Sequence, residues 1–402
     1  MNKNHIILVV LDGLGDQAVK SLGSRTPLEA ALTPNLDRAA KEGRCGLVEP
    51  VFKGLFPTSK DAHLSLFGYS LSKWDMGRGV VEAVGLGIKL KENDIAFRGD
   101  WATVNQNLEV VDRRAGRITE TRPLVRALKK INRIAGVKFI IKPGIEHRFV
   151  LVMRGKGLSD QVSANDWHQT GVKVPMITSL DKRPDSRRTA EILNEFISRA
   201  HQILENSSFN LKRKEKKKLS ANYLLVRGAG RFKDIPSFQK KWGLVAYCIT
   251  GGGLYQGIAR MLKMEEVKVE GANGRVTTNL KGKFKAAVRV SEKAPFLFLH
   301  IKGTDSLSHD GNCQGKKEFI EKIDQAIKPL FSLKEVTVIV TADHCTPCES
   351  KQHSTDLIPL LIWSKNRRGD EVEHWGEKEC PQGSLGIIQQ NQLIEKVLAD
   401  TV

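Results

Sequence analysis

The sequence contains no apolar run that approaches the roughly 20 residues needed to cross a lipid bilayer. The longest apolar run near the N-terminus, residues 6–11, is too short for the core of a signal peptide and is followed by Asp12 and Gly13. Only six cysteines occur in 402 residues, which argues against a disulfide scaffold and fits a reducing compartment. We therefore expect a cytoplasmic protein with no membrane partner.

Acidic residues are scarce relative to basic residues. The chain has 64 lysines and arginines against 45 aspartates and glutamates, which gives a formal net charge of +19. A positive field attracts anions such as nucleic acid, an acidic lipid surface or a small phosphorylated metabolite. Part of the excess lies in the run 212–218, which is most simply a solvated loop or helix face. No aromatic residue interleaves with this run, which weakens the case for a nucleic-acid site built on stacking.

Cys345 and Cys348 form the only CxxC motif of the sequence. A structural zinc site would need two further ligands at suitable spacing, and no second CxxC motif provides them. A redox role would place the pair at the start of a helix that follows a strand. Considered by itself, the motif leaves both interpretations open.

The length predicts two or three domains, and strands and helices alternate at both ends of the chain. Four apolar runs predict strands: 6–10, 296–301, 336–340 and 357–363. Four segments predict helices: 34–41 (beginning after Thr33), 192–204, 316–330 and 389–398. We therefore predict a discontinuous α/β domain, 1–88 plus 288–402, with a mostly parallel sheet flanked by helices. A second α/β domain is expected to be inserted at 89–287.

Acidic or histidine residues follow three of the predicted strands. The six residues in question are Asp12, Asp305, His309, Asp343, His344 and, in the next loop, His353. In open α/β sheets, ligand-binding groups collect beyond the carboxyl ends of the strands. Three carboxylates and three imidazoles are more ligands than one tetrahedral metal site uses, so we expect these six residues to be shared between two divalent cations. Two cations about 4 Å apart are a common device for displacement at phosphorus. Taken singly, each Asp could instead cap a helix, and each His could be a surface residue.

Ser59 is the candidate nucleophile. It lies in the turn-rich stretch 56–63, before an apolar helix predicted at 64–67. A serine oxygen bound to a divalent cation has a lowered pKa and can attack phosphorus. Without the metal ligands, Ser59 would be interpreted as a helix cap.

The chain resembles a known family, the archaeal-type cofactor-independent phosphoglycerate mutases of the alkaline phosphatase superfamily. The matching stretches are ordered along essentially the whole chain: VLDGLGD at 10–16, TPLEA at 26–30, TPNLD at 33–37, GRG at 77–79, DIAFR at 94–98, RAGR at 114–117, EHR at 146–148, RGAG at 227–230, GIAR at 257–260, HIKGTD at 300–305, SHDG at 308–311, DH at 343–344, TPC at 346–348 and HS at 353–354. The resemblance implies an alkaline-phosphatase-like core and removes the metal or redox interpretation of the CxxC motif.

The resemblance also implies roles for individual residues. Ser59 is expected to be transiently phosphorylated. One cation is expected to bind the set Asp12, Ser59, Asp343 and His344, and the other the set Asp305, His309 and His353. Manganese is the first expectation, with zinc, cobalt or magnesium as alternatives. The inserted domain is expected to bind the phosphate and carboxylate of the substrate through His147, Arg148, Arg154, Arg227 and Arg260.

The sequence departs from the family pattern in three places. Around Ser59 the family usually reads PGSDTAH, whereas residues 57–63 read PTSKDAH, so that Lys60 replaces an acidic neighbour. Lys60 could help to hold phosphate or could weaken metal binding. The stretch 163–168 lacks one Asp and a Pro of the family pattern, and Gly251–Gly253 replaces Gly-Thr-Ala.

We therefore expect an isomerase that interconverts 3-phosphoglycerate and 2-phosphoglycerate in glycolysis and gluconeogenesis without 2,3-bisphosphoglycerate. The alternatives are a metal-dependent phosphatase, another phosphomutase such as one that acts on pentose phosphates, or an inactive relative that binds nucleic acid through its positive charge. The oligomeric state is left open.

Overall fold

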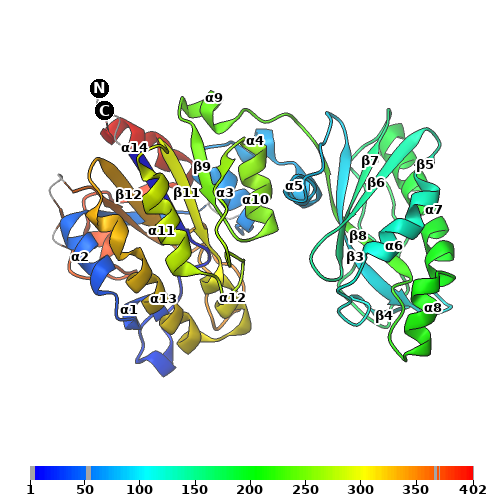
Figure 1. Cartoon of the computed structure of the whole chain (residues 1–402), viewed down its shortest axis with the longest axis horizontal. Helices are drawn as coiled ribbons and strands as arrows, with labels where there is room; N and C mark the ends of the chain where they lie inside the picture. The colour runs from blue at the N-terminus through cyan, green and yellow to red at the C-terminus, as the bar shows by residue number, and fades with distance from the viewer. Residues whose placement is uncertain (1–4, 51–55, 366–368, 371, 402) are drawn as a thin grey trace. The chain divides into compact units, whose positions relative to one another are not determined.

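The computed structural model describes residues 5–50, 56–365, 369–370 and 372–401. The chain forms two compact units (Figure 1). The first unit comprises residues 1–75 and 235–402, and the second comprises residues 76–234. These boundaries differ from the expected boundaries at 88 and 288.

Both differences have a physical reason. Residues 76–88 belong to the second unit because helix α5 (Gly77–Gly85) packs against its strands, most closely at Gly79, where a Cβ atom would lie 2.3 Å from the carbonyl oxygen of Ala96. Residues 235–287 belong to the first unit because strand β9 (Ala246–Ile249) pairs in parallel with β11 (Phe296–Ile301). A strand of four residues has too weak a sequence pattern to be predicted.

The first unit contains an eight-stranded sheet in the order β10-β9-β11-β1-β12-β13-β2-β14. Its remaining strands are β1 (His5–Leu11), β2 (Arg44–Glu49), β10 (Glu265–Glu266), β12 (Val336–Thr341), β13 (Ile358–Trp363) and β14 (Ile387–Gln389). Only β13 runs antiparallel to its two neighbours, β12 and β2. The predicted α/β fold with a mostly parallel sheet is therefore confirmed for this unit.

Helices cover both faces of this sheet. Residues 6–11 of β1 are at most 1% exposed, so side chains on both faces of the strand are buried. The helices of the unit are α1 (Pro27–Ala30), α2 (Pro34–Glu42), α3 (Ser59–Leu66), α4 (Leu71–Trp74), α9 (Phe238–Trp242), α10 (Gly253–Met261), α11 (Leu280–Ser291), α12 (Gly303–Asp310), α13 (Cys313–Ile327) and α14 (Leu393–Thr401). The α13 segment begins earlier than predicted because the Asn312 side chain caps it by accepting a hydrogen bond from the Gly315 backbone.

The second unit is built on a six-stranded antiparallel sheet. Its strands are β3 (Ile95–Val104), β4 (Val110–Asp112), β5 (Arg133–Ile134), β6 (Val137–Pro143), β7 (Arg148–Arg154) and β8 (Tyr223–Arg231). The order is β4-β3-β7-β6-β5, and β8 also pairs with β3. The unit combines strands and helices as expected, but neighbouring strands such as β6 and β7 are joined by short loops, which allow only antiparallel pairing.

Three further helices complete the second unit. They are α6 (Arg122–Leu128), α7 (Pro184–Glu205) and α8 (Ser208–Glu215), and α7 contains the predicted amphipathic helix. The basic run 212–218 lies at the exposed end of α8 and in the turn that follows. Within the residues that the structure describes, no helix is both long enough and apolar enough to cross a membrane.

Candidate active site

The topology of the first unit brings the candidate metal ligands to one edge of the sheet. Strands β11, β1 and β12 are parallel neighbours, so their carboxyl ends lie side by side. Asp12 directly follows β1, Asp305 lies in the first turn of α12 after β11, and Asp343 and His344 follow β12. All four side chains are buried, although three of them carry carboxylates. Buried carboxylates need compensation by donors or cations.

The first group surrounds the Nε2 atom of His344. This atom lies 3.3 Å from Ser59 Oγ, 3.2 Å from Asp343 Oδ2 and 3.7 Å from Asp12 Oδ1. Asp12 Oδ1 and Asp343 Oδ2 are buried and accept no hydrogen bond from any described residue. Asp343 Oδ2 also lies 3.3 Å from His63 Nδ1. The structure therefore brings together the four residues predicted to hold one cation, and two of their oxygen atoms accept no hydrogen bond from a described residue and face only imidazole nitrogens.

The other carboxylate oxygens of this group are held by the protein. Asp12 Oδ2 accepts hydrogen bonds from His300 Nε2, at 2.9 Å, and from the hydroxyl of Tyr255. Asp343 Oδ1 accepts a hydrogen bond of 3.1 Å from the Gly13 backbone. Each carboxylate is thus fixed through one oxygen and presents the other toward His344.

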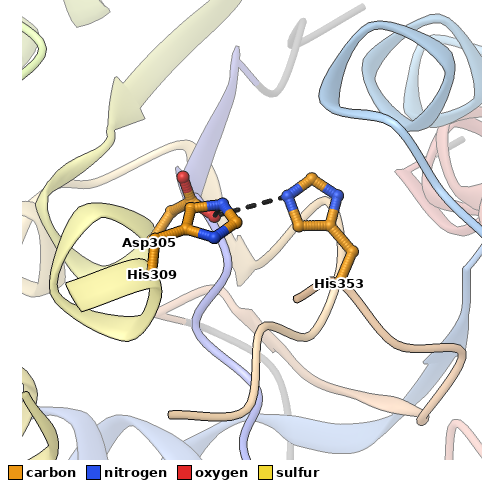
Figure 2. A group of neighbouring side chains, drawn as sticks. All are labelled: Asp305, His309 and His353. Carbon is orange, nitrogen blue, oxygen red and sulfur yellow. Dashed lines mark ion pairs between the residues drawn. The ribbon is translucent and has the colours of Figure 1, made fainter. Parts of the chain in front are cut away.

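The second group consists of Asp305, His309 and His353 (Figure 2). Asp305 Oδ1 lies 3.3 Å from His309 Nε2 and 3.6 Å from His353 Nε2, and Asp305 Oδ2 accepts a hydrogen bond of 2.6 Å from Lys302 Nζ. Burial alone would raise the pKa of Asp305, but its contacts with the two imidazoles and Lys302 hold that pKa well below its ordinary range. Asp305 also has an oxygen within 4.8 Å of ligand atoms of Asp12 and His344, so it is close to both groups.

Hydrogen bonds fix the orientation of all three imidazoles. His309 Nδ1 donates to the carbonyl of Lys351 at 2.8 Å, and His353 Nδ1 donates to the carbonyl of Pro57 at 2.6 Å. His344 Nδ1 lies 3.0 Å from the Thr346 hydroxyl, which itself donates to Asp305 Oδ1 at 3.1 Å. Because each Nδ1 atom donates a hydrogen bond, the neutral form of each imidazole has its lone pair on Nε2, where it faces a carboxylate oxygen.

This arrangement fits divalent cations. A lone pair that faces a carboxylate oxygen is repelled unless a proton or a cation lies between them. Without metal, burial lowers the pKa of His344, but Asp343, Asp12 and Asp305 outweigh it and raise the pKa to about 8. Carboxylate, imidazole and hydroxyl donors suit manganese, zinc, cobalt or magnesium, and a cation would take the place of the proton.

Ser59 is the first residue of α3, and its neighbour Thr58 is the helix cap, because the Thr58 side chain accepts a hydrogen bond from the Asp61 backbone. Lys60 does not act as a free cation beside Ser59. Its Nζ atom pairs with Asp61 Oδ1 at 2.7 Å and also with Asp75. The two carboxylates neutralise Lys60, so neither expected effect of this departure from the family pattern is supported.

Sequence reasoning gave no role to His300, Lys302 and Tyr255, which surround the Asp12 carboxylate. His300 and Lys302 lie within the matched stretch HIKGTD, so the resemblance contained a signal for them. Tyr255 lies in α10, and no sequence feature pointed to it. Its position depends on the packing of α10 beside α3.

A second candidate site lies within the second unit. A pocket of about 340 Å³ is lined by six arginines together with Asp100, Glu146, His147 and His168; the arginines are Arg98, Arg113, Arg114, Arg117, Arg148 and Arg227. The unit carries 32 lysines and arginines against 17 aspartates and glutamates, a net of +15 out of the +19 of the chain. The positive charge predicted to attract anions is therefore concentrated in this unit.

Carboxylates orient the arginines of this pocket. Asp166 accepts hydrogen bonds from Nε and Nη2 of Arg113, both at 2.8 Å, and from Arg227. Asp100 accepts a further hydrogen bond of 2.7 Å from Arg227. Burial lowers the pKa of His147; Asp100 opposes this effect, and Arg148 and Arg114 add to it, so that the net shift is downward. His147 is therefore neutral at pH 7 and can accept or donate a hydrogen bond.

Three of the five residues predicted to bind substrate line this pocket, namely His147, Arg148 and Arg227. Arg154 is not among the lining residues, because its guanidinium is bound by Asp94 and by the carbonyl of Lys89. Arg260 belongs to the first unit and pairs with Glu266 at 3.0 Å. Arg154 therefore lies outside this pocket, and the binding roles of Arg154 and Arg260 stay predictions.

Four pocket arginines were not predicted: Arg98, Arg113, Arg114 and Arg117. Arg98, Arg114 and Arg117 lie in the matched stretches DIAFR and RAGR, but the resemblance assigned these residues no role. Arg98 is 8% exposed, and burial lowers its pKa to about 10, which is unusual for an arginine.

Comparison with known proteins identifies the family. Residues 40–210 match the family described as 2,3-bisphosphoglycerate-independent phosphoglycerate mutase. Over 405 aligned residues the chain is 42% identical to "2,3-bisphosphoglycerate-independent phosphoglycerate mutase 1" of Methanocaldococcus jannaschii, covering 100% of this chain and 98% of that protein. The chain belongs to this family. The phosphoglycerate mutases are isomerases, and the resemblance noted in the sequence is confirmed.

Two solved structures share the fold of this chain, and one of them is named a phosphoglycerate mutase. The cofactor-independent phosphoglycerate mutase from Thermoplasma acidophilum is 33% identical, with a TM-score of 0.76 over 99% of this chain and 100% of that one. The PH0037 protein from Pyrococcus horikoshii is also 33% identical, with a TM-score of 0.85 over 99% of this chain and 97% of that one. The phosphoglycerate mutase fold thus extends over both units of the chain.

Proposed function

We propose that the chain is a cytoplasmic phosphoglycerate mutase that interconverts 3-phosphoglycerate and 2-phosphoglycerate through a phosphoserine at Ser59, without 2,3-bisphosphoglycerate, in glycolysis and gluconeogenesis. One observation carries the proposal. The hydroxyl of Ser59 lies 3.3 Å from His344 Nε2, beside two buried carboxylate oxygens that no described residue satisfies. This is the environment in which a serine could be activated by a divalent cation.

Seven residues would hold two divalent cations. One set is Asp12, Ser59, Asp343 and His344, and the other is Asp305, His309 and His353. When bound, such cations lower the pKa of a coordinated hydroxyl and neutralise negative charge on a transferring phosphoryl group. Manganese is the first expectation among the metals that this donor set suits.

The chain's own residues stabilise the phosphorylated serine. Ser59 lies at the N-terminus of α3, where the helix dipole and free backbone N–H groups favour negative charge. The ammonium group of Lys302, fixed by Asp305 and lying 3.4 Å from Asp12, offsets part of the negative charge of these two carboxylates, which would otherwise repel a phosphate on Ser59. These groups are held in place before the reaction, so little reorganisation is needed when charge develops.

The arginine pocket of the second unit is the proposed binding site for the anionic groups of phosphoglycerate. A guanidinium binds a carboxylate or a phosphate through two parallel hydrogen bonds, and six guanidinium groups line the pocket. The glycerate must remain bound while its second hydroxyl takes back the phosphoryl group. Water must be excluded during this time, since its attack on phosphorylated Ser59 would release phosphate.

The test is a coupled enolase assay with 3-phosphoglycerate and manganese, without 2,3-bisphosphoglycerate. We expect turnover that a chelator abolishes and that Ser59→Ala abolishes together with the phosphoserine. Ser72→Ala, which removes an exposed hydroxyl in α4, is the matched control and should retain turnover. Turnover that survives both chelation and Ser59→Ala would refute the mechanism.

Product analysis in the same assay separates the alternatives. A phosphatase would accumulate free phosphate from phosphoglycerate, and a phosphomutase for pentose phosphates would leave phosphoglycerate unchanged. An inactive relative would show neither reaction but would bind DNA or RNA in a salt-sensitive manner.

A further inference from the structure

Lys316 is a lysine buried at the centre of a polar cluster in the first unit. It lies in α13, and its side chain is 0% exposed. Its Nζ atom lies 2.8 Å from Asp16 Oδ2, 3.0 Å from the carbonyl oxygen of Gly13, and 3.3 Å from the carbonyl oxygens of Gly15 and Thr346. An ammonium group has three N–H donors, so four oxygen acceptors engage all of them.

The acceptors come from the two loops that contain the candidate metal ligands. Gly13, Gly15 and Asp16 directly follow Asp12, and Thr346 comes two residues after His344. The same loops are joined by a hydrogen bond of 2.9 Å from the Thr346 backbone to the Gly15 carbonyl. Lys316 therefore lies beneath both loops and binds them from the side of the protein interior.

Asp16 completes this link. Its carboxylate neutralises Lys316 and accepts hydrogen bonds from the backbone of Cys348, at 3.1 Å and 3.2 Å. A buried ion pair contributes little net stability compared with apolar residues of similar volume. The pair is therefore better explained by what it positions than by its contribution to folding.

Thr346 connects the Lys316 cluster to both metal groups. Its carbonyl accepts from Lys316, and its hydroxyl lies between His344 Nδ1, at 3.0 Å, and Asp305 Oδ1, at 3.1 Å. His344 belongs to one ligand set and Asp305 to the other. A shift of Thr346 would therefore displace a ligand of each set.

We propose that Lys316 is a positioning residue for both metal ions, acting through the two loops and the hydroxyl of Thr346. The proposal rests on the metal-binding role proposed above. Groups that hold metal ligands from behind typically change metal affinity by about 10–100-fold when removed. Lys316 does not contact the metal ligands directly, but it holds Thr346, which contacts a ligand of each set. Removing Lys316 should therefore lower the affinity of both metal sites.

The experiment compares Lys316→Met with Lys317→Met as the matched control. Lys317 is the next residue of α13 and pairs with Glu321 at 2.6 Å, and among the described residues no hydrogen bond or ion pair joins its side chain to either loop. Each full-length protein is loaded with Co²⁺, whose visible absorption depends on ligand geometry, and is then titrated with a chelator. Lys316→Met should bind Co²⁺ about 10-fold more weakly or worse and show an altered spectrum. Lys317→Met should match the wild type in both measurements.

A second variant separates positioning from folding. Lys316→Met alone leaves the Asp16 carboxylate buried without its partner, which lowers stability. The double variant Lys316→Met with Asp16→Asn removes both charges, so it should recover thermal stability while Co²⁺ affinity stays low. A folded double variant with wild-type affinity and spectrum would overturn the proposal. Wild-type protein that binds no metal would instead refute the proposed function itself.

Discussion

Asp166→Asn offers a direct test of the arginine pocket. The Asp166 side chain is 1% exposed and pairs with Arg113 through two hydrogen bonds and with Arg227 through one. Removing one partner of a buried ion pair costs about 3–5 kcal/mol. Since Arg113 and Arg227 are 16% and 17% exposed and can regain some water, we expect a loss near the lower limit, about 3 kcal/mol.

The same change should weaken substrate binding. Without Asp166, the guanidinium groups of Arg113 and Arg227 lose their fixed orientation and must be ordered when substrate binds. A cost of about 1.4 kcal/mol corresponds to a tenfold increase in KM for 3-phosphoglycerate.

Asp94→Asn is the matched control, because Asp94 is 2% exposed and holds Arg154 in a similar pair outside the pocket. Urea unfolding should show a comparable loss of stability for both variants, whereas the coupled assay should show a raised KM only for Asp166→Asn. An unchanged KM in Asp166→Asn would refute the role of the pocket. An equally raised KM in Asp94→Asn would show that Arg154 binds substrate after all.

Three further predictions follow from the electrostatics. Because Asp343 and its neighbours raise the pKa of His344 to about 8, a metal ion must displace a proton from His344 below that pH. Chelator competition should therefore show that metal affinity rises from pH 6 to pH 8 and levels off above pH 8. A flat profile would contradict this. Because the second unit carries a net charge of +15, which attracts the anionic substrate, kcat/KM should fall with added KCl while kcat stays constant. Replacing the exposed lysines of 212–218 with glutamine should make kcat/KM less dependent on KCl. Burial lowers the pKa of Lys283 to about 8, below its ordinary 10.5. Between these two pH values the unfolded state binds more protons than the folded state, so the free energy of unfolding should rise with pH, by at most about 3 kcal/mol. Urea unfolding of Lys283→Met should lack this rise.

The candidate metal ligands could be predicted from sequence because their convergence depends on topology alone. Parallel strands end at the same edge, and Asp12, Asp305 and Asp343 each follow a strand whose apolar pattern is strong. Predicting the edge required neither side-chain rotamers nor loop conformations. For the same reason the prediction extended to His344, which adjoins Asp343.

The arginine pocket could not be predicted in the same way, because it depends on antiparallel register. Arg98 and Arg227 share the pocket because β3 and β8 pair with these two residues opposite each other. A different register would place them apart without changing the apolar pattern. Similarly, nothing in the local sequence around Lys60 indicates that Asp75, fifteen residues away, neutralises it.

The two candidate sites place their charged groups by the same physical principle. Asp12 and Asp343 each use one oxygen for hydrogen bonds with the protein, and the other accepts no hydrogen bond from a described residue. Asp166 holds two arginines whose remaining N–H groups can face the pocket. In each case folding pays part of the cost of burying and orienting a charge before any ligand arrives. Binding then needs to order fewer groups, so more of the interaction with a cation or an anion is retained as affinity. Asp12 Oδ1 and Asp343 Oδ2 are therefore the atoms of the first site at which a cation would replace a hydrogen bond that folding does not supply.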